Sequence, residues 1–131
     1  PNYWLEGKQS AMRLASYNIP YDTRYADLSI TIFSGDGGGT LSNINRWRGQ
    51  LNLKPQSIEE VNKDATLATS KIGQFKVYKI VNNNKLESAF LCSIIEDKSS
   101  TIFVKLTATA NGISSLEDEF IEFCSSFKYS N

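Results

Sequence analysis

Alternating hydrophobic and polar residues predict β-strands along much of the chain. Residues 24–33 place Leu28 and Ile30 on one side and hydroxyl residues on the other, which is the pattern of a strand with one buried face. Three further strands are predicted at 75–81, 88–96 and 101–108, with polar turns at 82–84 and 97–100. Because the run 89–95 is almost wholly hydrophobic, we expect it in the centre of the sheet, covered on both faces.

The first residues predict an opening hairpin. Segments 3–5 and 11–17 have short strand-like patterns on either side of Gly7, a residue typical of turns. Pro20 and Asp22 then interrupt the alternation, so we expect the second of these strands to end before Pro20.

Hydrophobic residues recur at helical spacing in three other segments. The first predicted helix runs from about residue 40 to 52 and buries Leu41, Ile44, Trp47 and Leu51. The second follows a capping box at 57–60, in which a serine and a glutamate satisfy the first amides of a helix, and should turn Ile58, Val61, Ala65 and Ala68 inward. The third is predicted to begin at a second capping box, 114–117, and to present Leu116, Phe120, Phe123, Cys124 and Phe127 on one face, with Lys128 near its end.

This order of elements predicts a single domain over residues 1–131. Short turns can join only antiparallel neighbours, so the fold class is α+β with a mostly antiparallel sheet. A central strand covered on both sides further predicts helices on both faces of that sheet.

Composition and charge narrow the classes of function. The chain has 40% hydrophobic residues and equal numbers of basic and acidic residues, 14 of each, so general nucleic-acid binding is not expected. No apolar run approaches the roughly 18 residues that span a bilayer. Cys92 and Cys124 each fall on an apolar face, and we expect two buried free thiols rather than a disulfide.

The chain contains no histidine, which removes the commonest general base and the commonest metal ligand. The acidic clusters 59–60 and 117–119 are placed at predicted helix starts, where carboxylates stabilise the helix dipole. We therefore predict a non-enzymatic protein with no cofactor and no metal site. An enzyme using Asp36 with Arg46 or Arg48 is the less favoured alternative, because no nucleophile or base accompanies them.

A glycine-rich corner precedes the first helix and is the main candidate site. Its spacing fits neither a P-loop nor a dinucleotide fingerprint, but amides at a glycine-rich helix start can face an anion; the alternative is a tight structural corner. We expect Arg48 to act as a structural clamp on Asp36 or on a backbone carbonyl, and Arg46 and Asn43 to face solvent. The candidate binding residues are Asp36, Gly37, Gly38, Gly39, Thr40, Asn43, Arg46 and Trp47.

The block 35–55, GDGGGTLSNINRWRGQLNLKP, together with Trp4 and the strands 12–16 and 103–107, resembles a group of bacterial exported or lipid-anchored proteins. Members of that group carry a GG-x-L-x-N-x-N-R-W-R-x-Q block, and the group is similar to the Mog/PsbP-like superfamily of α/β/α sandwiches. The resemblance implies a binding scaffold in the periplasm or another extracytoplasmic place. An export signal or lipid anchor would then lie on a segment outside this chain.

These observations favour a non-catalytic accessory or protein-interaction domain of the bacterial cell envelope. We expect an unidentified protein partner, a monomeric state and no nucleic-acid ligand. The alternative is a small-ligand or anion-binding module centred on the 35–40 corner and Arg46.

Overall fold

The computed structural model describes residues 11–35, 37–96 and 100–127. The described elements are β1 (Ala11–Tyr21), β2 (Arg24–Ser34), α1 (Thr40–Gln50), α2 (Ile58–Asp64), β3 (Thr66–Thr69), β4 (Gln74–Val81), β5 (Ala89–Glu96), β6 (Ser100–Ala108) and α3 (Ala110–Ser125). The six strands form one antiparallel sheet in the order β1-β2-β6-β5-β4-β3. Segment 3–5, Gly7, Asp36 and Lys128 lie outside the described residues.

The first hairpin pairs β1 with β2, and its turn falls at Asp22, where φ is 49°. Our prediction that the strand ends before Pro20 is wrong, since Pro20 lies within β1 opposite Tyr25. Proline is tolerated there because β1 is an edge strand and its missing N–H costs no bond within a central ladder. Leu28 and Ile30 in β2 are buried as predicted, but Ser29, which the alternation placed on the opposite side, is buried too, at 8% exposure.

The predicted meander is confirmed by β4, β5 and β6, each antiparallel to the next. The central position predicted for β5 is also confirmed, because every residue from 89 to 95 is buried. The sheet order adds a fact that the local pattern does not contain: β6 lies between β5 and β2. The hairpin of β1 and β2 therefore extends the meander, and β1 is the end strand of the sheet that the described residues form.

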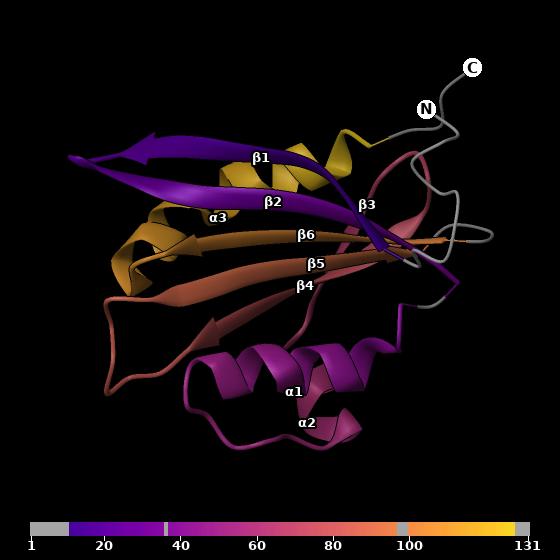
Figure 1. Ribbon diagram of the computed structural model, residues 1–131, viewed down its shortest axis with the longest axis horizontal. Helices are drawn as coiled ribbons and strands as arrows, with labels where there is room; N and C mark the ends of the chain where they lie inside the picture. The colour runs from indigo at the N-terminus through magenta and orange to yellow at the C-terminus, as the bar shows by residue number, and fades with distance from the viewer. Residues whose placement is uncertain (1–10, 36, 97–99, 128–131) are drawn as a thin grey trace.

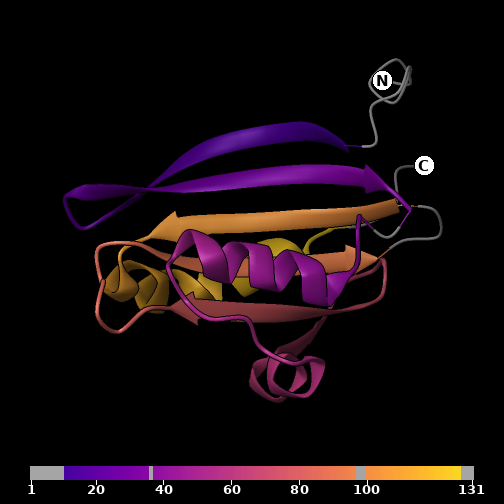
Figure 2. The same cartoon turned by 60° about the horizontal axis from the view of Figure 1, so that its bottom comes forward.

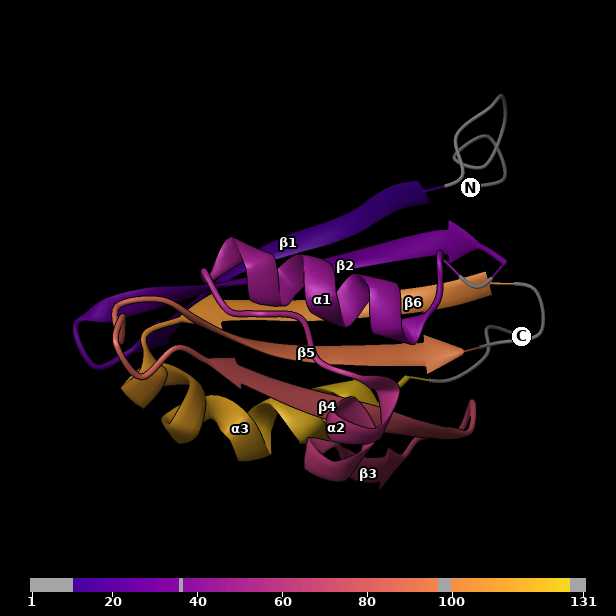
Figure 3. The same cartoon turned by 90° about the horizontal axis from the view of Figure 1, so that it is seen from below.

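Helices lie on both faces of the sheet (Figure 1). On one face α1 crosses the middle of the sheet, with α2 beside β3 and β4 (Figures 2 and 3). The core there contains Ile44, Trp47, Leu51, Val61, Tyr78, Ile80, Phe90, Cys92, Ile94 and Phe103. On the other face α3 packs on β5 and β6 over a second core, which includes Leu91, Leu106, Ile113, Leu116, Phe120 and Cys124. The fold is thus α+β, and none of the described helices is long and apolar enough to cross a membrane.

The capping box predicted for α2 is confirmed. The Ser57 hydroxyl accepts from the Glu60 amide, and the Glu60 carboxylate accepts from the Ser57 amide. The prediction that Ala68 faces inward from this helix is wrong, because the helix ends at Asp64 and Ala68 belongs to β3. Of the other residues predicted to face inward, Val61 is buried and Ala65 is partly buried against the same core, whereas Ile58 is 44% exposed.

The start of α3 also differs from the prediction. The helix begins at Ala110, four residues before the expected capping box, and its N-cap is Thr109. The Thr109 hydroxyl accepts from the Gly112 amide at 3.0 Å. The segment 114–117 is therefore helix interior, and the acidic cluster 117–119, predicted at the helix start, does not occupy the first turn.

Candidate functional site

The glycine corner before α1 is a tight structural bend. Gly37, Gly38 and Gly39 have φ of 64°, 92° and 88°, values in the left-handed region that glycine adopts without a Cβ penalty. A Cβ on Gly37 would lie 3.0 Å from the Phe103 ring and 3.3 Å from Phe33. The corner thus needs glycine for both backbone angle and space.

Asn43 holds this corner from within α1. Its amide nitrogen donates to the carbonyls of Gly37 and Gly39 at 2.9 and 2.7 Å, and its oxygen accepts from Arg46 Nη2 at 3.0 Å. The prediction that Asn43 faces solvent is wrong, since it is 6% exposed. Because its donors and its acceptor are used internally, Asn43 has a structural role.

The other candidates on α1 divide between core and surface. Trp47 is 2% exposed and meets Phe103 edge-on, with ring centroids 5.5 Å apart. Arg46 is exposed, and its guanidinium carbon lies 5.5 Å from the Trp47 ring centroid. Arg48 Nε donates to the Lys54 carbonyl at 2.7 Å, which is the backbone partner expected for a clamp. Thr40 is the first residue of α1.

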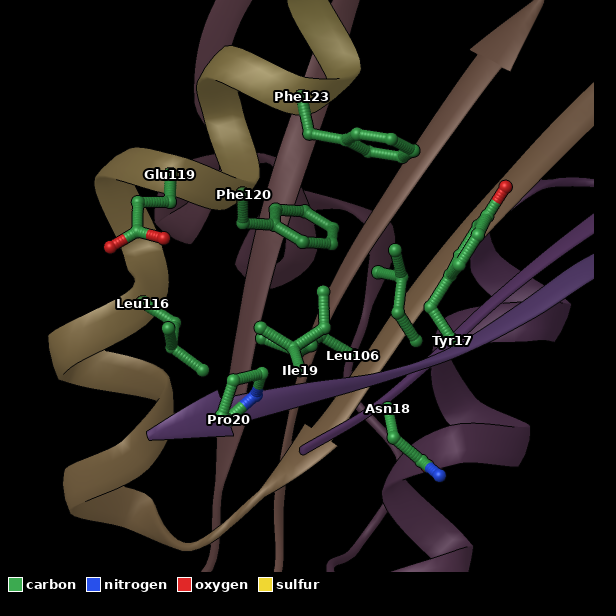
Figure 4. Close-up of a pocket in the computed structure, with 10 residues that line it drawn as sticks. Tyr17, Asn18, Ile19, Pro20, Leu106, Leu116, Glu119, Phe120 and Phe123 are labelled. Atoms are coloured by element: carbon green, nitrogen blue, oxygen red, sulfur yellow. The ribbon is translucent and has the colours of Figure 1, made fainter. Parts of the chain in front are cut away.

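A hollow with a mostly apolar lining is on the opposite face of the sheet. A groove of about 430 Å³ runs between β1 and α3, a size typical of small-ligand sites. Figure 4 shows Phe120 and Phe123 projecting from α3 toward the side of β1 that carries Tyr17, Ile19 and Pro20, and Leu106 also lines the hollow. Leu28 and Leu116 complete the apolar lining, and Asn18 and Glu119 are its polar members.

Strand register explains how the groove forms. Tyr17, Leu28 and Leu106 are side-by-side partners across β1, β2 and β6, so their side chains share the α3 face. Leu28 and Leu106 are both 2% exposed, whereas Tyr17 is 50% exposed. α3 packs chiefly on β5 and β6 and meets β1 much less. The groove is the part of this face that the helix leaves uncovered.

A contact between β1 and the start of α3 sets where the helix lies. The Tyr21 hydroxyl donates to Thr109 Oγ1 at 3.3 Å and accepts from the Thr109 amide at 3.2 Å. These two bonds lower the pKa of Tyr21. A Cβ on Gly112 would lie 2.6 Å from the Tyr21 ring and 3.0 Å from Ala108 Cβ. The missing side chain of Gly112 therefore lets the helix start lie against the end of β1.

The cysteines are free and buried, as expected. Burial raises the pKa of the Cys92 thiol far above its usual range and that of Cys124 to about 12. Thiols in this state are poor nucleophiles. Among the described residues no group of three or more His, Cys, Asp or Glu side chains is placed to hold a metal ion.

Comparison of the chain with family models, with curated proteins and with solved structures finds no match. The assignment of a candidate site therefore depends on the geometry of the described residues. The sequence pattern assigned Phe120 and Phe123 to one apolar helical face but did not show that part of that face stays open. The sequence feature that indicates this open part of the helical face is the length of its aromatic row, which continues past Phe120 to Phe123 and Phe127, both half-buried.

Proposed function

We propose that this chain is a non-catalytic binding domain that recognises a protein partner through the groove between β1 and α3. The observation that carries the proposal is an apolar hollow whose floor is buried and whose aromatic rim, at Tyr17 and Phe123, is accessible. Uncovered apolar surface of this kind marks interaction sites in soluble domains. The few polar groups at its edge can orient what binds.

The glycine corner supports binding less well. Asn43 is used by two carbonyls and by Arg46, and Trp47 is part of the core. An anion at this corner would depend on Arg46 and on backbone amides without a side-chain donor from Asn43. We therefore assign the corner to the folding of α1 onto the sheet.

The resemblance described above supports a place for this domain. We propose an accessory domain of the bacterial envelope, periplasmic or lipid-anchored through a segment outside this chain, with the PsbP-like α/β/α sandwich as its fold type. The antiparallel sheet with helices on both faces agrees with that fold type without singling it out. The proposed domain acts as a monomer, and its equal numbers of acidic and basic residues favour a protein partner over a nucleic acid.

The accessibility of the groove is tested with phenylnaphthylamine, a neutral dye that fluoresces in apolar surroundings. We expect saturable binding of one dye per chain, weakened at least tenfold by Tyr17→Ser and by Phe123→Ser. The matched control is Tyr25→Ser, because Tyr25 is 70% exposed on the same hairpin and, three residues from Leu28, projects from the other face. Equal dye binding by all four proteins would refute the assignment of the groove.

A further inference from the structure

A hollow with a polar lining lies on the α1 face of the sheet, away from the groove. Its volume is about 290 Å³, at the lower end of the range of small-ligand sites, about 300–1,000 Å³. The start of α1 and the short helix α2 lie on this face, over β5 and β4 (Figure 3). The polar side chains that line the hollow belong to Thr40 of α1, Asn62 of α2, Gln74, Lys76 and Tyr78 of β4, and Glu96 of β5.

The hydroxyl of Tyr78 is left without a partner at this hollow. Tyr78 is 6% exposed, yet its hydroxyl forms no hydrogen bond with another described residue, whereas a buried tyrosine hydroxyl ordinarily has one. Tyr78 also borders a smaller cavity of about 40 Å³ that is lined by Asp64. Burial and, after it, the carboxylate of Glu96 raise the pKa of Tyr78, and Asp64 does not act on it. The hydroxyl therefore lies on the side of the polar hollow, where Glu96 is.

Two opposite charges face the same hollow without pairing with each other. Lys76 lies opposite Ile94, two residues from Glu96 on the neighbouring strand, so the two charged residues are diagonal neighbours on one face of the sheet. The Lys76 ammonium instead donates to Asn62 Oδ1 at 3.2 Å. Glu96 is exposed and forms no ion pair within the described part of the chain. The hollow thus offers one positioned ammonium group and one available carboxylate.

The start of α1 adds a third polar element. Thr40 is the first residue of this helix and lines the hollow. The N-cap is Gly39, which supplies no capping side chain, and no acidic residue lies in the first turn. Because the first amides of a helix favour a negative group, they and Lys76 suit a carboxylate. Glu96 and the Tyr78 oxygen suit an ammonium group.

We propose that this hollow is a second binding site, separate from the groove, and that its ligand is a small zwitterion of the α-amino-acid class. A ligand that carries both charges complements Lys76 and Glu96, and hydrogen bonds between charged groups are stronger than those between neutral ones. The Tyr78 hydroxyl can donate to the carboxylate of the ligand or accept from its ammonium group. A sugar could use the same hydroxyl and amide groups, but it would leave both charges of the site without a counter-charge.

The first test is calorimetric titration of the intact chain with the standard α-amino acids at millimolar concentration. The amino acid that binds most tightly is then compared with its decarboxylated amine, with its deaminated acid and with glucose. We expect saturable binding of one amino acid per chain, weakened at least tenfold when either charge of the ligand is removed. Equal binding of the amine or of the acid, or binding of glucose in place of the amino acids, would overturn the proposal. Absence of binding by every compound would overturn it too and leave the hollow to water.

The second test removes the charges of the site. Glu96→Gln and Lys76→Met should each weaken binding of the amino acid at least tenfold. The matched controls are Glu87→Gln and Lys85→Met, because both residues are exposed and lie outside the hollow, and they should leave binding unchanged. Equal losses in the variants and their controls would show a general effect of charge and refute this site.

The third test removes the unpartnered hydroxyl and keeps the ring. Tyr78→Phe should weaken amino-acid binding at least threefold without lowering the free energy of unfolding in urea, a combination that a merely structural role of the hydroxyl would not produce. Tyr17→Ser should weaken dye binding in the groove and leave amino-acid binding unchanged, so that the two sites can fail independently. Amino-acid binding that Tyr78→Phe does not alter would place the ligand elsewhere and contradict the proposal.

Discussion

Gly112 offers a sharp test of how α3 is held. Replacing a helical glycine by alanine ordinarily stabilises a helix by about 1 kcal/mol. Here the new Cβ would lie 2.6 and 2.7 Å from two carbons of the Tyr21 ring and 3.0 Å from Ala108 Cβ. Carbon atoms pack favourably only at about 3.5–4.0 Å, so the ring or the helix must move.

The magnitude follows from these opposing terms. Overpacking typically costs about 1–3 kcal/mol, and displacing Tyr21 also strains its two hydrogen bonds with Thr109, each contributing about 0.5–1.5 kcal/mol. After the gain in helix propensity is subtracted from these costs, we expect Gly112→Ala to lower the free energy of unfolding by about 1–2 kcal/mol. The same substitution at an unhindered helical glycine should be stabilising, and Gly49, which has open space at its Cβ position, is the matched control.

The assay is urea unfolding of a double-mutant cycle with Tyr21→Ala. Removing the ring removes the two closest contacts, so Gly112→Ala should cost little or become stabilising in that background. The coupling energy should be about 1–2 kcal/mol, within the range measured for residues in contact. An additive cycle, or stabilisation by Gly112→Ala alone, would refute the view that Tyr21 and Gly112 position α3.

Three further outcomes follow from buried groups. Asn43→Ala should lower the free energy of unfolding by about 1–3 kcal/mol, because hydrogen-bonding groups of the glycine corner lose their partner. The control Asn83→Ala, at an exposed position, should change the free energy of unfolding in urea by less than about 0.5 kcal/mol. Ser93 Oγ is buried and makes no hydrogen bond of standard geometry, although it acts on the weakly polar Cys124 thiol. Ser93→Ala should therefore stabilise by about 1 kcal/mol in the same assay. The thiols of Cys92 and Cys124 should react with a thiol reagent only after unfolding. Because burial raises the pKa of Cys124 from 9.0 to about 12, the stability that its protonated form contributes is complete below pH 9 and is lost as pH rises toward 12. Alkaline unfolding curves that match those of Cys124→Ala would contradict this pH dependence.

The strands of the meander could be predicted because their information is local. The alternation in 24–33 and the hydrophobic run 89–95 indicate directly which sides of these strands face the core. The capping box at Ser57 is local too, since its two partners are three residues apart. Each of these patterns needs no knowledge of the rest of the fold.

The errors share a long-range cause. Gly112 lies in a segment, 110–113, that is typical of a turn, and the space left by its missing side chain is filled by Tyr21, far away in the sequence. Pro20 continues a strand because β1 lies at the sheet edge, which depends on β6 pairing with β2. Asn43 is at a polar position of the helix, yet the bend of the glycines turns two carbonyls toward it.

The groove illustrates the same limit for function. Periodicity shows that Phe120 and Phe123 share a helical face, but it does not show how far the sheet beneath extends. That extent is decided by the strand order, which places α3 over β5 and β6 and leaves Tyr17 on β1 uncovered. A site formed where a helix is narrower than the sheet beneath it can be recognised only when both are assembled. The glycine corner has the stronger sequence motif, yet the groove, which has no motif, is the site to which we assign the proposed function.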